Sequence, residues 1–171
     1  VHNFFWDAST PFLQPISNSP ISPMIFISIV LGPFFGLIAI VFMYIILAFA
    51  KLPRKMGLTS FQSLLIAIIG LSIIGTFLPE VMGLGTTAIV NLTNGNALLA
   101  VAVAILLAKI VATALSLGFG FFGGVFSPAL LVGAAAGSAA TALLNITGIY
   151  SFEGPELVIC GMAAVAGSVV G

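Results

Sequence analysis

The fold of this chain is decided by the stretch at residues 110–152, which reads IVATALSLGFGFFGGVFSPALLVGAAAGSAATALLNITGIYSF. It runs for 43 positions without a charged side chain. As a single helix it would be about 65 Å long, about twice the thickness of the hydrocarbon core of a bilayer. The stretch must therefore break inside. The residues that mark the break are Gly118, Gly120, Gly123, Gly124 and Pro128.

The composition of the whole chain points to lipid as its main solvent. Of the 171 residues, 61% are hydrophobic and only 5% are charged, with four Lys or Arg against four Asp or Glu. A soluble domain carries about 25% charged residues, because its surface must face water. This composition excludes a nucleic-acid binder, which needs a basic face, and it excludes a disordered linker. With Cys160 as the one cysteine, a disulfide scaffold is excluded too.

Further uncharged runs on both sides of this stretch predict an all-α, polytopic membrane protein. The helices expected from these runs lie at residues 24–50, 61–78, 97–117, 125–144 and 157–170. Polar residues gather in connectors at residues 51–60, 80–96 and 145–156. We expect Gly32-Pro33 to kink the first helix without ending it. Small residues one turn apart, at Gly32 and Gly36 and at Gly133 and Gly137, predict close helix packing.

The charges also predict the topology. Lys51, Arg54 and Lys55 form the only basic cluster, and the positive-inside rule places that connector in the cytoplasm. Residues 1–23 then form an extracytoplasmic or lumenal connector, without the basic region of a signal peptide. Because the chain begins with valine and ends inside an apolar run, we expect residues 24–171 to be part of a larger transmembrane domain, truncated at both ends.

The sequence lacks the side chains of a catalytic or metal centre. His2 is the only histidine, so neither a Ser-His-Asp triad nor a His/Cys metal cluster can form, and we expect no enzyme activity, metal or cofactor. Residues 118–123 match the dinucleotide pattern G-x-G-x-x-G. That motif requires a preceding strand and an acidic residue about 20 positions later. Here the next acidic residue, Glu153, lies 30 positions beyond Gly123.

The break at residues 118–128 has the chemistry of a small-anion site. A helix that begins near Val125 within the membrane presents free backbone N–H groups and its positive dipole end, and both favour anions. Gly123 and Gly124 let the backbone approach an ion, and Pro128 lies in the first turn, where its missing N–H costs nothing. Broken helices are a recurrent device of transporters. On these residues alone, a simple packing bend is an equal alternative.

Lys109 lies well inside an otherwise apolar run. A buried ammonium in lipid costs about 2.5–3.5 kcal/mol on insertion scales, so such a residue usually faces protein or water. Lys109 is either a structural pairing or snorkelling residue, or a fixed positive charge that favours an anion path.

The segment GFGFFGGVFSP at residues 118–128 resembles the G-x-G-x-x-G-G-x-F-x-P signature of the CLC family of chloride channels and chloride/proton antiporters. Three other stretches agree with the family in order and spacing. They are LPEVMGLG at residues 78–85, AKIVAT at 108–113 and ICGMAA at 159–164. The resemblance covers about residues 24–171. It implies the second half of a CLC-type membrane domain, an inverted-repeat helical fold with broken or re-entrant helices, found as a homodimer with one anion path per subunit.

The resemblance also implies a set of site residues. The backbone amides of Val125 and Phe126, at the x-F positions of the signature, would coordinate chloride. Lys109, from its position inside an apolar run, is the candidate field residue. The loop and helix start that shape the site would be formed by Gly120, Gly123, Gly124, Ser127 and Pro128.

The predicted function is transmembrane transport of chloride or similar small anions, as a voltage-gated-type chloride channel or a chloride/proton antiporter. The protein would be a multi-pass protein of a prokaryotic cell membrane, or of a plasma or organelle membrane in a eukaryote. The expected partners are chloride, the lipid bilayer, the remainder of the same polypeptide and a second subunit, with no nucleic acid.

Two alternatives stay open. One is another secondary transporter with broken helices, which calls for an acidic residue at membrane depth; Glu80 is the only candidate. The other is a non-transporting structural subunit, in which the glycine break packs dry against neighbouring helices. The gating and proton-transfer glutamates and the pore tyrosine of the family would lie outside this chain, so both the channel and the antiporter mechanism are open.

Overall fold

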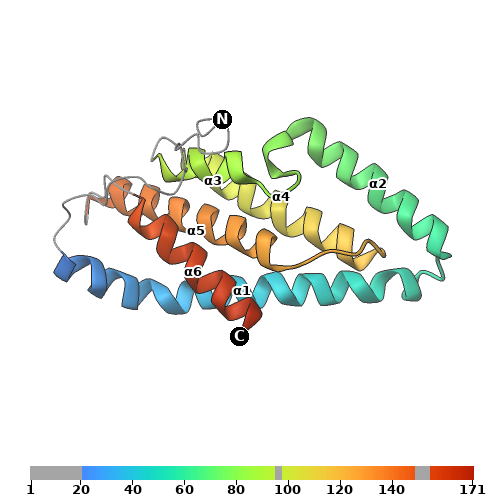
Figure 1. The fold of residues 1–171 in the computed structure, drawn as a ribbon, viewed down its shortest axis with the longest axis horizontal. Helices are drawn as coiled ribbons and strands as arrows, with labels where there is room; N and C mark the ends of the chain where they lie inside the picture. Colours follow the sequence, from blue (N-terminus) through green and yellow to red (C-terminus); the bar gives the residue numbers. More distant parts are fainter. Residues whose placement is uncertain (1–20, 95–97, 149–154) are drawn as a thin grey trace, which may run out of the picture.

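The structure is a computed structural model that describes residues 21–94, 98–148 and 155–171, with the side chains of the first helix described from Ile25 onward. All regular structure in these ranges is helical (Figure 1), which confirms the predicted fold class. In chain order the elements are α1 (Ile21–Lys55), α2 (Ser60–Phe77), the short 3-10 helix η2 (Pro79–Val81), α3 (Thr86–Thr93), α4 (Leu99–Gly118), α5 (Phe126–Thr147) and α6 (Glu156–Val170). Four of these, α1, α2, α4 and α5, are long and apolar enough to cross a membrane.

The first helix is longer than its apolar run. It continues through Pro33, as expected, and also takes in the basic cluster up to Lys55. The prediction of a connector over residues 51–60 was therefore wrong for its first half. The reason is electrostatic: Arg54 and Lys55 occupy the last turn, where positive charge is favoured by the negative end of the helix dipole. Thr59 then starts α2 through a capping box.

The connector predicted at residues 80–96 was also wrong, because it contains η2 and α3. The sequence of α3, TTAIVNLT, is rich in β-branched residues, which have low helix propensity, and no side chain caps its start. Its buried face holds it in place instead. Ile89 and Leu92 pack in one core cluster with Ile105 of α4 and Leu131 of α5.

The centre of the molecule is α5, which lies between α4 and α6 (Figure 1). Of its apolar window 61% is buried, against 17% for α1 and 11% for α2. A second core cluster joins it to α1 and α6, through Phe35 and Phe42 on α1, Ala136 on α5 and Val165 on α6. The exposed apolar side chains of α1 and α2 face outward, as expected of surfaces that meet lipid or further protein.

Small residues bring α5 and α6 into backbone contact, as predicted for Gly133 and Gly137. A Cβ atom added at Gly137 would collide with the carbonyl oxygen of Leu157, and one added at Gly133 would collide with that of Gly161. At Gly32 and Gly36, in contrast, an added Cβ would meet no described atom within 4 Å. The close packing predicted there is not made by any described element.

Candidate anion-binding site

The break in the 43-residue stretch begins where α4 meets α1. A Cβ atom on Gly118 would lie 2.8 Å from the backbone carbon of Phe49, so only glycine fits. The next residue, Phe119, is buried and packs edge-on against the Phe49 ring, with 6.4 Å between the ring centroids. Gly120 has a φ of +107°, a conformation that side chains rarely allow. The chain therefore leaves the helix here because of glycine geometry and a close contact with α1.

This contact also indicates the depth of the break. Phe49 lies two residues before Lys51, where the basic cluster of α1 begins. Two helical residues span about 3 Å along the axis. The break therefore begins near the basic end of the bundle, and α5 runs away from it toward the opposite end (Figure 1).

The start of α5 presents free backbone donors. The first helical hydrogen bond is donated by Ala129 N–H to the Val125 carbonyl, at 3.0 Å. No side chain caps the helix. Pro128 has no N–H, so the N–H groups at this helix start that have no acceptor among the described residues are those of Val125, Phe126 and Ser127. The structure places Pro128 in the first turn, as predicted, and adds the Ser127 amide to the two that the resemblance implies.

The side chain of Ser127 contacts a different element. Its hydroxyl donates a long hydrogen bond, 3.5 Å, to the Leu84 carbonyl in the turn between η2 and α3. That turn also packs beneath α5, because an added Cβ on Gly85 would collide with the side chain of Leu131. The turn therefore contacts the first two turns of α5 through Ser127 and Leu131. These contacts do not involve the free N–H groups, which have no side-chain cap.

Lys109 is tied to the same turn. Its side chain is 4% exposed, and its Nζ donates hydrogen bonds to the carbonyl oxygens of Val81 and Gly83, both at 2.8 Å. The structural pairing considered for this residue is therefore present, with backbone carbonyls as partners. Since the turn contacts Lys109 on one side and α5 on the other, it joins α4 to the start of α5.

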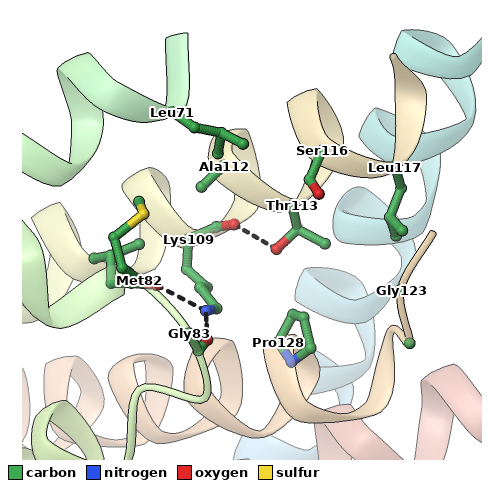
Figure 2. Close-up of a pocket in the computed structure, with 12 residues that line it drawn as sticks. Leu71, Met82, Gly83, Lys109, Ala112, Thr113, Ser116, Leu117, Gly123 and Pro128 are labelled. Atoms are coloured by element: carbon green, nitrogen blue, oxygen red, sulfur yellow. Dashed lines mark hydrogen bonds between the residues drawn. The ribbon is translucent and has the colours of Figure 1, made fainter. Parts of the chain in front are cut away.

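A pocket of about 260 Å³ lies between α2, α4, this turn and the start of α5 (Figure 2). It brings Lys109 together with three residues of the signature, Gly123, Gly124 and Pro128. Val125 and Phe126 do not line it. Gly120 lies at a separate pocket, beside Arg54 at the basic end of α1.

The polar lining of the pocket includes a polar face of α4 that the sequence analysis did not identify. Thr113 and Ser116 follow Lys109 by four and seven positions, which places all three on one face of α4. Figure 2 shows their side chains along this face, with the Thr113 hydroxyl bonded to the Lys109 carbonyl at 2.8 Å. Helical spacing indicates such a polar face. The carbonyls of Val81 and Gly83 carry no side-chain signal and appear only in the structure.

Two other predictions concern acidic and nucleotide chemistry. Glu80 is exposed on η2 and accepts a hydrogen bond of 3.5 Å from the Asn91 amide. Within the described residues it is therefore an exposed side chain with one polar contact. The G-x-G-x-x-G match follows the helix α4, without the strand that the dinucleotide motif needs. Glu153, with residues 1–20, lies outside the described residues.

Comparisons of the sequence with known proteins give a family match and two relatives. The profile of the voltage gated chloride channel family matches residues 3–171. The H(+)/Cl(-) exchange transporter ClcA of Vibrio parahaemolyticus serotype O3:K6 (strain RIMD 2210633) is 30% identical over 168 residues, covering 92% of this chain and 35% of the relative. The ClcA transporter of Vibrio campbellii (strain ATCC BAA-1116) gives the same identity and coverage. No solved structure shows a significant match.

The chain thus spans about a third of the length of these curated relatives. The family match covers both the signature at residues 118–128 and the four membrane-length helices around it. The chain is a multi-pass membrane protein and belongs to the CLC family of voltage gated chloride channels and chloride/proton exchangers.

Proposed function

We propose that this chain forms part of the ion path of a chloride transporter that exchanges chloride for protons. The observation that carries the proposal is the start of α5. Three adjacent N–H groups without acceptors in the described residues, at Val125, Phe126 and Ser127, lie at the positive end of a 22-residue helix. Such a cluster favours a small anion and needs no formal cation at the ion itself.

Exchange is favoured over passive flow by the relatives, since both ClcA proteins are named as H(+)/Cl(-) exchange transporters. The accessibility of the break supports transport over a purely structural subunit. Gly123 and Gly124, which precede the free amides, are exposed in the described structure, whereas a structural bend would pack dry.

The same proposal covers the setting of the site. Residues 24–171 would be part of the second half of a CLC-type transmembrane domain, in a homodimer embedded in the bilayer. Lys51, Arg54 and Lys55 would lie on the cytoplasmic side, and residues 1–23 on the other. In the site itself, Gly120, Gly123 and Gly124 would shape the loop, and Lys109 would add positive potential near it.

The test is a flux measurement on the full-length polypeptide that contains this chain, reconstituted in liposomes loaded with potassium chloride. Valinomycin provides a potassium path, so chloride efflux becomes electrically possible. We expect rapid chloride efflux together with proton uptake into the liposomes, driven by the outward chloride gradient. Protein-free liposomes, and liposomes loaded with the large anion gluconate, serve as controls. Absence of chloride flux would overturn the proposal, and flux without coupled protons would overturn exchange in favour of a channel.

A further inference from the structure

The charge of Lys109 is only partly compensated in the described residues. Its ammonium has three N–H donors, and the carbonyls of Val81 and Gly83 accept two of them. Within the ranges that the structure describes, no carboxylate forms an ion pair with it. Carbonyl groups offer dipoles, while a buried ammonium needs a full negative charge nearby to offset the loss of hydration. A site with an uncompensated positive charge favours an anion as its third partner.

The pocket that Lys109 lines has room for such a ligand. Its volume of about 260 Å³ compares with about 30 Å³ per molecule in liquid water. It therefore accommodates a small anion with several waters. Ser116 adds a hydroxyl group to the wall (Figure 2), whereas the hydroxyl proton of Thr113 is donated to the Lys109 carbonyl. Gly123 and Gly124 add exposed backbone.

A second source of positive potential meets Lys109 in this pocket. Pro128, in the first turn of α5, forms part of the wall, so the pocket lies beside the positive end of that helix dipole. The ammonium and the dipole are fixed in place, since Lys109 is held by two hydrogen bonds of 2.8 Å and α5 by the core. A pocket whose positive potential comes from fixed groups needs little rearrangement to bind an anion.

We infer that this pocket is a second binding site for a small inorganic anion, which accepts the third N–H of Lys109. It is separate from the site proposed at the start of α5, because Val125 and Phe126 do not line the pocket. The two sites use different chemistry, a side-chain ammonium in one and backbone amides in the other. The inference therefore does not depend on the proposed transport function.

The experiment uses bromide as the probe, because its anomalous scattering identifies it in a crystal. The full-length protein is crystallised in bromide in place of chloride, and anomalous maps are compared for the parent and for Lys109→Met. We expect a bromide peak in contact with Lys109 Nζ in the parent, and loss of this peak in the variant. Lys51→Met, which removes an exposed lysine outside the pocket, is the matched control and should retain the peak.

The parent map decides the inference even if Lys109→Met fails to fold. A bromide peak only at the amides of Val125 and Phe126 would overturn the second site and leave the proposed function intact. A carboxylate from another part of the full-length polypeptide in contact with Nζ would also overturn it, since that group would supply the missing charge. A peak at Lys109 without one at the α5 amides would support this inference and count against the proposed path.

Discussion

The backbone amide of Phe126 can be removed without changing its side chain, and this gives the sharpest test of the α5 site. Replacing Phe126 by its α-hydroxy acid, through nonsense suppression in the full-length protein, turns the amide N–H into an ester oxygen. Proline is less suitable here. It disfavours the α region for the preceding residue, and Val125 lies in that region, at φ −88° and ψ −16°.

The magnitude follows from the geometry of the site. Three amides at the start of α5, at residues 125–127, have no acceptor among the described residues, and the ester removes one of them. A hydrogen bond to a charged partner contributes about 1.5–3 kcal/mol. Chloride affinity should therefore fall by about 10-fold to 150-fold, at 1.4 kcal/mol per factor of ten. Isothermal titration of chloride into the purified protein measures this directly.

Phe61 provides a matched control. It is the second residue of α2, its side chain is 70% exposed, and its N–H lies in a first helical turn, where no intrahelical acceptor exists. The same ester at Phe61 should leave chloride binding unchanged. Phe126→Leu, which keeps the amide, should cost less than about 1.5 kcal/mol, the range of roughly volume-conserving swaps. Equal losses for the two esters, or no loss at Phe126, would refute the account of the site.

Three further predictions concern the topology, the packing of α5 against α6, and the hydrogen bond from Ser127 to the turn before α3. In intact cells, Ser9→Cys should react with an impermeant thiol reagent and Ser60→Cys should not; the reverse pattern would invert the orientation. Gly137→Ala should destabilise the protein by about 1–3 kcal/mol through overpacking against the α6 backbone, whereas Gly36→Ala should be tolerated. Thermal unfolding in detergent compares these two, and equal midpoints would contradict the packing. Ser127→Ala should weaken chloride binding by less than about 1.5 kcal/mol, because the Ser127 hydroxyl makes only a long hydrogen bond to a neighbouring turn. Chloride titration measures this, and a loss as large as that of the Phe126 ester would show that the hydroxyl itself binds the anion.

The sequence by itself determined the membrane class, the helices α2, α4, α5 and α6 to within a few residues, and the break at residues 118–125. The reason is that these features follow from local chemistry. An apolar run longer than the bilayer must break, and glycine with proline sets the place. The signature also predicted that the amides of Val125 and Phe126 bind an anion, and this stays a prediction; the structure shows that these amides lie at a helix start without a side-chain cap.

Tertiary structure alone decided the surroundings of that site. α3 forms despite a sequence of low helix propensity, because Ile89 and Leu92 are buried against α4 and α5. The partners of Lys109 are the main-chain carbonyls of residues 81 and 83. Every residue has such a carbonyl, so the sequence does not indicate which two would accept these hydrogen bonds. Only the folded turn, with Gly83 at a φ of 63°, directs these two oxygens to one ammonium. Side-chain patterns therefore predicted which segments are long and apolar enough to cross the membrane, while backbone geometry decided which of them meet around Lys109 and the start of α5.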